Sequence, residues 1–195
     1  MRKIFWLCVC LPLTLGAANL LPNGDFEKDG GWKPWGWRKG VDPKAVFAYD
    51  TAVFHSGKRS LRVMDNWDFS LPYAICTVPA APDAKGYRLT FWARAEKEQV
   101  FRAGIVFIGA RKDGTKGNLL WKDIPLTAGP EWKKFTYELS AVQPLDSIQI
   151  FFGATAKENS LTGAAWIDDV ELVPLDKDPT PPKEPAVVIG RPTTM

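Results

Sequence analysis

Apolar and polar positions alternate along many short segments of the chain. Between positions 87 and 95, Leu89, Phe91 and Ala93 alternate with residues of other kinds, and a similar spacing recurs in 147–154. An alternation of period two is typical of β-strands with two different faces. The pattern predicts strands at 45–54, 59–64, 71–78, 87–95, 100–110, 119–124, 132–139, 147–154 and 164–172.

Turn-forming residues separate these segments, and no stretch keeps the 3.6-residue apolar period of a helix. Asp113-Gly114 lies between two predicted strands and favours a hairpin-type reversal there. Many short strands at regular spacing without helices predict an all-β fold, a β-sandwich or jelly roll.

The N-terminus has the organisation of a secretory signal peptide. Positive charges at Arg2 and Lys3 precede an apolar run from 4 to 15, and small residues follow at 16–18. We expect cleavage after Ala18 and a secreted, periplasmic or cell-surface protein. The apolar run is shorter than the ~20 residues of a membrane helix, and no later segment approaches that length, so we expect no membrane span.

Prolines concentrate at the other end of the chain, from Pro174 onward, among charged residues and threonines. Proline donates no backbone hydrogen bond and favours extended conformations, so the stretch from 173 is not expected to form a helix or an internal strand. We therefore expect one domain at 19–174 and a proline-rich disordered tail or linker at 175–195.

Cysteine content and charge exclude several classes of protein. Cleavage would leave Cys76 as the one remaining cysteine, which excludes an intramolecular disulfide and favours a buried thiol. The net charge of +3 includes Arg2 and Lys3, so the mature chain is near +1. Because charges of both signs are interspersed, we expect no nucleic-acid partner.

No catalytic constellation can be assembled from the sequence. The single histidine, His55, lies in a turn beside Ser56, and no nucleophile–base pair can be built around it. Asp168 and Asp169 are neighbours whose side chains should point to opposite faces of a strand, which is wrong for two carboxyl groups flanking one glycosidic bond. We expect a protein that is not an enzyme.

Four segments, taken in order, resemble the carbohydrate-binding modules of the family 4/9/22 type. They are NLLPNGDFE at 19–27, SGKRSLRV at 56–63, YRLTFWAR at 87–94 and AWIDDVEL at 165–172. The resemblance covers nearly all of 19–174. It implies a galactose-binding-like β-jelly roll in which the first and last segments lie side by side, and a polysaccharide or oligosaccharide partner.

The same resemblance implies a structural calcium ion that pins the N-terminal segment to the last strand. Calcium takes six to eight oxygen ligands. The matching positions are the carbonyl groups of Asp25 and Lys58 and the carboxylates of Glu27 and Asp168. Asp169 is a weaker candidate, because alternation points its side chain away from that of Asp168. The alternative is that both carboxylates are ordinary surface acids.

Aromatic residues supply the candidate sugar contacts. A pyranose ring stacks on an aromatic plane, while polar side chains bind its hydroxyl groups. Trp35, Trp37 and Trp67 fall in turn-rich loops, where an aromatic side chain is not committed to the core. Strand alternation adds four outward-facing residues, and the resemblance implies that they line one groove on an outer sheet face: Tyr73, Trp92, Arg94 and Gln149.

The remaining tryptophans have a simpler structural interpretation. We expect Trp32, Trp121, Trp132 and Trp166 to close the sandwich or to cover an edge. Two other functions stay open at this stage. One is a secreted adhesion or structural sandwich that contacts protein or the cell surface, and the other is a small glycoside hydrolase or lyase. Nothing in the pattern requires an oligomer, so we expect a monomer.

Overall fold

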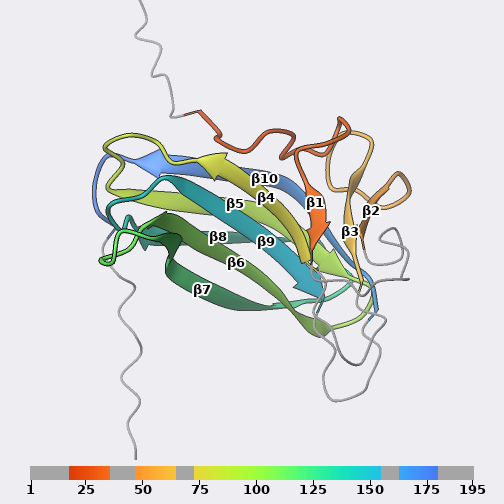
Figure 1. Ribbon diagram of the computed structural model, residues 1–195. Helices are drawn as coiled ribbons and strands as arrows, with labels where there is room; N and C mark the ends of the chain where they lie inside the picture. The colour runs from red at the N-terminus through yellow and green to blue at the C-terminus, as the bar shows by residue number, and fades with distance from the viewer. Residues whose placement is uncertain (1–17, 36–46, 65–72, 155–162, 180–195) are drawn as a thin grey trace, which may run out of the picture.

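A computed structural model describes residues 18–35, 47–64, 73–154 and 163–179, and this part of the chain contains strands and turns but no helix. Figure 1 shows two layers of strands packed face to face. The strands are β1 (Lys33–Trp35), β2 (Phe47–Asp50), β3 (Ser60–Val63), β4 (Tyr73–Pro79), β5 (Gly86–Ala95), β6 (Gln99–Ala110), β7 (Lys116–Ala128), β8 (Lys133–Ser140), β9 (Ser147–Ala154) and β10 (Ala165–Leu175).

The strands form two antiparallel five-stranded sheets. Sheet 1 has the order β1-β4-β9-β6-β7, and sheet 2 has the order β2-β3-β10-β5-β8. Neighbouring strands are mostly distant in sequence, so each sheet is assembled by long-range pairing. The predicted all-β sandwich of jelly-roll type is therefore confirmed.

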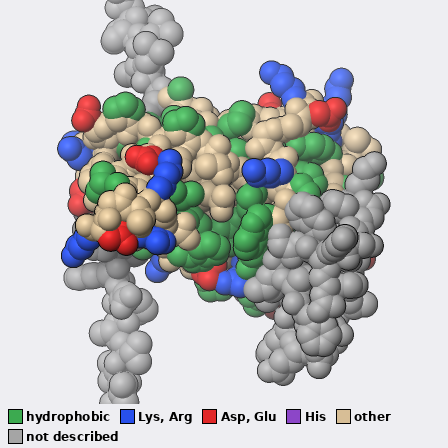
Figure 2. All heavy atoms as spheres, viewed as in Figure 1, with side chains coloured by type: hydrophobic (Ala, Val, Ile, Leu, Met, Phe, Trp, Pro, Cys, Tyr) green, Lys and Arg blue, Asp and Glu red, His purple; other side chains and the backbone are tan. Residues whose placement is uncertain are grey.

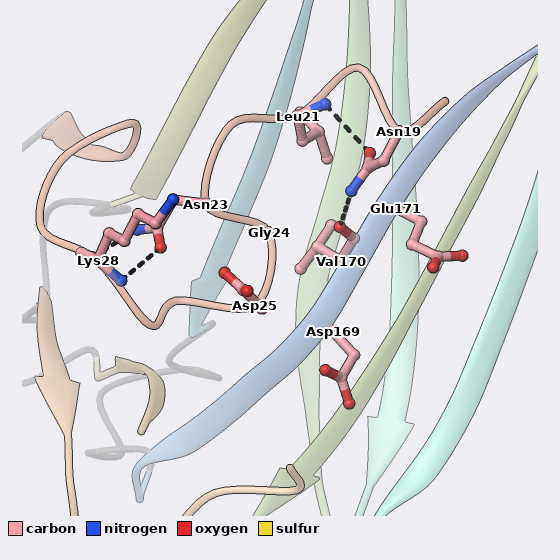
Figure 3. A pocket seen from close by; sticks show the side chains of 9 residues that line it. All are labelled: Asn19, Leu21, Asn23, Gly24, Asp25, Lys28, Asp169, Val170 and Glu171. Carbon is pink, nitrogen blue, oxygen red and sulfur yellow. Dashed lines mark hydrogen bonds between the residues drawn. The ribbon is translucent and has the colours of Figure 1, made fainter. Parts of the chain in front are cut away.

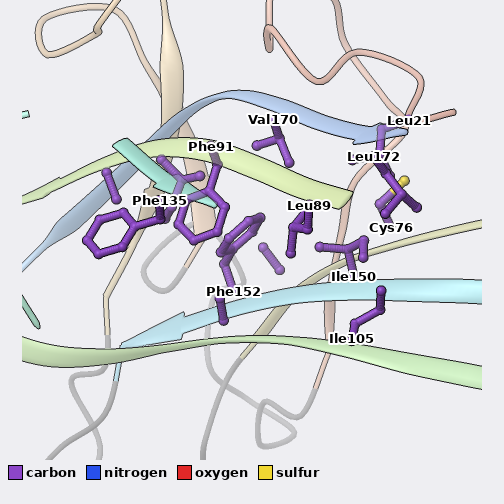
Figure 4. Close-up of a cluster of buried hydrophobic side chains, with 14 of the residues drawn as sticks. Leu21, Cys76, Leu89, Phe91, Ile105, Phe135, Ile150, Phe152, Val170 and Leu172 are labelled. Carbon is purple, nitrogen blue, oxygen red and sulfur yellow. The ribbon is translucent and has the colours of Figure 1, made fainter. Parts of the chain in front are cut away.

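The core fills the space between the sheets with inward-facing apolar side chains from both (Figure 4). Phe91 of β5 and Phe152 of β9 meet across this space with ring centroids 4.9 Å apart, in a T-shaped arrangement. Cys76 is buried in the same core, as predicted, and burial raises the pKa of its thiol to about 11. Its thiol is therefore protonated and unreactive at neutral pH.

Most predicted strands match the observed ones within a few residues. β9 has the predicted bounds, and the Asp113-Gly114 reversal joins β6 to β7 as an antiparallel hairpin. β2 is shorter than the predicted 45–54, and β7 extends beyond 119–124 at both ends. β1 was not predicted, because three residues that include Pro34 show no alternation.

The predicted end of the last strand, at Leu172, needs a correction. β10 continues through Leu175, where it pairs with Gly86 of β5, so Val173 and Pro174 are strand residues. The proline is tolerated because β3 pairs with β10 only at 165–167 and the N-terminal segment bonds β10 no further than Leu172, so no described strand pairs with Pro174 on that side. Proline, which lacks the N–H of a ladder bond, fits such an edge.

The N-terminal segment is bound to the last strand, as expected. The backbone N–H of Leu20 donates to the carbonyl of Leu172 at 2.9 Å, and the Asn19 amide bonds the backbone of Val170 and Leu172. The beginning and the end of the domain therefore lie side by side. Phe26 completes this junction by inserting its ring fully into the core.

Several sequence predictions lie outside the described residues. These are residues 1–17 of the signal peptide, the indoles of Trp37 and Trp67, and most of the tail, from 180 to 195. Among the residues that the structure does describe, none belongs to a helix that could span a membrane.

Candidate functional site

The outer face of sheet 1 carries an apolar floor that does not belong to the main core. Tyr73, Ile75, Val106 and Phe151 are each at most 7% exposed, although their side chains point away from the space between the sheets. They come from three adjacent strands, β4, β9 and β6. Figure 2 shows hydrophobic side chains gathered in the middle of one face of the molecule.

Four aromatic rings form a continuous row across this face. Trp35 stacks on Tyr73 at 5.9 Å between centroids, Tyr73 meets Phe151 at 4.9 Å, and Phe151 meets Trp121 at 5.2 Å. The row ends in two exposed indoles, with Trp35 52% and Trp121 44% exposed. Because β1 and β7 are the two edges of sheet 1, a ligand touching both indoles would lie across the strands.

A glycine makes this arrangement possible. Gly104 of β6 lies opposite Phe151 in the sheet, and a methyl group at Gly104 would come within 2.0 Å of the phenyl Cζ. The ring therefore lies over the backbone of β6. A bare backbone at this point lets Phe151 reach towards Trp121, so the two halves of the row are joined.

The row borders a hollow of about 220 Å³, lined by Trp35, Tyr73, Ile75, Ile108, Asn118, Trp121, Gln149 and Phe151. The Gln149 amide donates to the Thr77 hydroxyl at 3.0 Å, which fixes the orientation of that amide. Thr77, Gln149, Val106 and Trp121 lie in one row across four strands. The hollow therefore combines aromatic walls with amide groups that can bind hydroxyls.

A polar group stands beside the aromatic row. Arg102 of β6 donates from Nη1 to the Tyr73 hydroxyl at 3.1 Å, and its Nη2 is paired with Asp123 of β7. Each charge thus has a counter-charge. The second carboxylate oxygen of Asp123, Oδ1, is buried and has no hydrogen-bond partner. A buried acceptor without a donor costs free energy.

The sequence-predicted contacts divide between the two sheets. Trp35, Tyr73 and Gln149 come together at the hollow on sheet 1. The prediction that Trp92 and Arg94 line the same groove is wrong, because β5 belongs to sheet 2. Alternation along a strand tells which residues face outward, but not which sheet the strand joins.

Trp121 is a candidate site residue that sequence reasoning missed, since it was expected to close the sandwich or cover an edge. It lies on an edge strand, but its indole is exposed beside the hollow. The sequence held a sign of this exposure. In an alternating strand over 119–124, positions 121 and 124 lie on opposite faces, so a buried Ile124 places Trp121 on the outer face. Trp32 and Trp166 are buried, as predicted.

A second site candidate is the turn at 55–59, where carboxylates from distant segments converge. Glu27 Oε1 accepts the backbone N–H groups of Lys58 at 2.7 Å and Arg59 at 3.2 Å. Gly57, with φ of 65°, leaves room for this approach, because a methyl group there would come within 2.2 Å of Glu27 Oε1. The N-terminal segment is thereby attached to the turn.

Asp168 of β10 holds the same turn from the other side. Its Oδ2 accepts the backbone N–H groups of His55 at 2.8 Å and Ser56 at 3.1 Å, and its Oδ1 accepts the N–H of Asp169. The side chain is completely buried, and burial raises the pKa of the Asp168 carboxyl to about 6, against the hydrogen bonds that lower it.

The expectation that Asp169 points away from Asp168 is wrong. Asp169 has a φ of 49°, within a β-bulge of β10, and this conformation breaks the alternation. Asp169 accepts the Ser56 hydroxyl at 2.7 Å and contacts His55 Nδ1 at 2.7 Å. Because serine and histidine each bond the aspartate rather than each other, this group has no activated serine nucleophile.

The predicted ligands are of the chemical types that calcium takes. Glu27 and Asp168 supply carboxylates at this turn, and the other two predicted ligands, Asp25 and Lys58, would supply main-chain carbonyl groups. The described residues contain no group of three or more His, Cys, Asp or Glu that could hold a metal. An ion here would therefore depend on main-chain carbonyls as well as on the two carboxylates.

A polar cavity of about 260 Å³ adjoins this region (Figure 3). It lies between the N-terminal segment and β10, with Asp25 and Lys28 on one side and Asp169 and Glu171 on the other. Figure 3 shows these acidic side chains spread around the opening rather than directed at one point. The carboxylate groups that line the cavity therefore do not converge on one point where an ion could bind.

The sequence matches no protein-family model and no curated protein. Its fold matches 140 chains of solved structures, among them these three. A domain described as TmCBM61 in complex with β-1,4-galactotriose has a TM-score of 0.58 at 17% identity, over 81% of this chain and 99% of that one. The C-terminal family 22 module of Clostridium thermocellum Xyn10B has a TM-score of 0.52 at 14% identity, over 77% and 90%.

The third is the enzymatically active domain of bacteriophage CBA120 tailspike protein 4. It has a TM-score of 0.56 at 16% identity, over 80% of this chain and 21% of that one, so this chain spans about a fifth of its length. Identities this low are evidence for the fold alone, and fold does not fix function. The chain has the β-sandwich fold that these carbohydrate-binding modules share.

Proposed function

We propose that this protein is a non-catalytic module, acting outside the cytoplasm, that binds a polysaccharide on the outer face of sheet 1. The observation that carries the proposal is the row of four aromatic rings that ends in the exposed indoles of Trp35 and Trp121. Solvent-exposed aromatic rings over a buried apolar floor offer flat surfaces on which the C–H faces of sugar rings can stack.

The polar residues of this face suit a ligand rich in hydroxyl groups. The Gln149 amide is already oriented by Thr77, so little side-chain entropy is lost when it binds a hydroxyl. The Arg102–Asp123 pair presents compensated charges next to the rings. Such preorganised groups give specificity, while the aromatic contacts give most of the binding energy.

Affinity gels that contain individual polysaccharides will test this proposal. We expect one or more polysaccharides to retard the protein, and Trp121→Ala to weaken that binding at least about tenfold, because a buried aromatic contact is commonly worth 2 kcal/mol or more. Phe54→Ala, which removes an exposed aromatic ring outside both proposed surfaces, is the matched control and should leave the retardation unchanged. Absence of retardation by every polysaccharide, in a folded protein, would favour a protein-contacting sandwich instead.

We also propose that calcium binds at the turn between Glu27 and Asp168, with the Asp25 and Lys58 carbonyls as further ligands. Its support is the convergence of the two carboxylates on residues 55–59. A bound cation would offset the cost of burying the Asp168 carboxylate and would add to the hydrogen bonds that already hold the turn.

Thermal unfolding with calcium or with chelator will test the ion. Calcium at about 100 times its Kd would add roughly 2.7 kcal/mol, which for a domain of this size raises the Tm by about 5–10 °C. Glu27→Gln keeps the acceptor for the Lys58 and Arg59 N–H groups but removes the charge, so we expect it to abolish the shift. Glu138→Gln, in a surface pair with Arg88, should retain the shift. A calcium shift of equal size in Glu27→Gln would contradict this site.

A further inference from the structure

The outer face of sheet 2 carries a second aromatic group, arranged around an arginine. Trp92 and Arg94 occupy alternate positions of β5. Both face away from the core, because the intervening Ala93 and the preceding Phe91 are fully buried on the other face of the strand. Trp166 of β10 pairs with Arg94 in the sheet, and the guanidinium carbon lies 5.5 Å from the centre of its indole ring. Trp166 thus positions the guanidinium.

Arg94 has no counter-ion. Within the described residues it forms no ion pair and no hydrogen bond, and its Nε is shielded from solvent without an acceptor. A guanidinium presents five N–H donors in a fixed fork, and leaving a shielded donor unpaired costs free energy. By contrast, Arg88 on the same face of the same strand is paired with Glu138 at 2.7 Å.

The acids around this end of sheet 2 are committed elsewhere. Glu96, two residues beyond Arg94, accepts the backbone N–H of Ala164 at 3.4 Å. Asp50 accepts the Trp166 indole N–H at 2.8 Å, together with two backbone N–H groups. Asp168 is occupied by three backbone N–H groups, and Asp169 by His55 and Ser56. Lys134, which pairs with Trp92 across the sheet, adds a further exposed positive charge. Among the described residues, none of these carboxylates is therefore paired with Arg94.

The rings beside Arg94 are held in place. The Trp92 indole stacks on the His55 imidazole at 4.0 Å with an interplanar angle of 17°, and His55 meets Trp132 edge-on at 5.5 Å. Both indoles remain partly exposed. Positions two apart on a strand are separated by about 7 Å, so Trp92 and Arg94 can both be reached by one sugar residue.

We propose that this surface, formed by Trp92, Arg94, Trp132 and Trp166, binds a uronic-acid residue of an acidic glycan. The sugar carboxylate would pair with the Arg94 guanidinium, and the pyranose ring would lie against the neighbouring indoles. An acidic peptide would satisfy the charge but has no ring to use the aromatic surface. This site lies on the opposite sheet from the proposed polysaccharide site and is independent of it.

Isothermal titration of the purified protein with trigalacturonate tests this site, with β-1,4-galactotriose as the neutral comparison ligand. We expect binding of the acidic trimer that weakens at least about tenfold in Arg94→Met, because the charge-assisted pair is lost while an unbranched side chain is kept at this position. Arg88→Met removes a cation from the same face and strand and should change the affinity less than twofold. Arg94→Lys, which keeps the charge, is the second variant if Arg94→Met fails to fold.

Four results would overturn the site. The first is no binding of trigalacturonate by the folded wild type, and the second is an equal loss in Arg88→Met, which would indicate general charge attraction. The third is loss of trigalacturonate binding in Trp121→Ala, which would place the acidic ligand on sheet 1. The fourth is equally tight binding of triglutamate, which would show that the face selects charge alone. Failure of neutral polysaccharide binding bears only on sheet 1.

Discussion

Asp168→Ala will destabilise the fold by at least about 3 kcal/mol, because the substitution leaves three partly buried N–H groups without their acceptor. Those groups belong to His55, Ser56 and Asp169, and the carboxylate that binds them is completely buried. Relief of the cost of burying the carboxylate offsets only part of this loss. For a domain of this size the Tm should fall by about 6–12 °C.

The measurement is urea unfolding of the wild type and of two aspartate-to-alanine variants. Asp146→Ala is the matched control, since Asp146 forms an exposed pair with Lys116 at 3.1 Å. An exposed pair contributes about 0–1 kcal/mol, so this variant should unfold close to the wild type. If Asp168→Ala lost no more stability than Asp146→Ala, the turn at 55–59 would not depend on this carboxylate.

Gly104→Ala will disrupt both the fold and the aromatic row of sheet 1. The added methyl group would lie 2.0 Å from the Phe151 ring and 2.7 Å from the Lys122 carbonyl, so the ring has to move and the backbone of β7 resists. Overpacking of this kind costs about 1–3 kcal/mol. Displacing Phe151 separates Tyr73 from Trp121, so polysaccharide retardation should also be lost.

Gly129→Ala is the control for this substitution, because the nearest atom to its added methyl would be the Glu98 Cα at 3.9 Å. We expect unchanged retardation and a Tm within about 2 °C of the wild type, as for a surface substitution. The two variants are compared on the same affinity gels and by thermal unfolding. A Gly104→Ala protein that bound polysaccharide as well as Gly129→Ala would show that the row does not require Phe151 in this position.

The carboxylates at the 55–59 turn show how local structure can override a strand rule. Strict alternation separates Asp168 from Asp169, but the bulge and the positive φ of Asp169 bring both acids to the same turn. A positive φ at an aspartate leaves no reliable mark in the sequence, because asparagine and aspartate tolerate that conformation in many contexts. Only the pairing of β10 with its neighbours located the bulge.

The contrast between Trp92 and Tyr73 shows the same limit at a larger scale. Both face outward, as alternation indicated, yet they lie on opposite sheets. Which strands share a sheet depends on long-range pairing, and this pairing follows from how all the segments bury their apolar faces together. The sequence pattern therefore identified outward-facing candidates but could not sort them into sites.

The sequence by itself determined the fold class, most strand positions, the hairpin at Asp113-Gly114, the burial of Cys76 and the junction of the first and last segments. These features follow from period-two alternation, from turn chemistry and from short motifs, all of which act over a few residues. The tertiary structure alone decided that Trp121 joins Trp35 and Tyr73 on sheet 1, and that Trp92 and Arg94 form a separate surface on sheet 2. The physical reason is that a strand's alternation is fixed by its own backbone, whereas its neighbours are fixed by the packing of the whole chain.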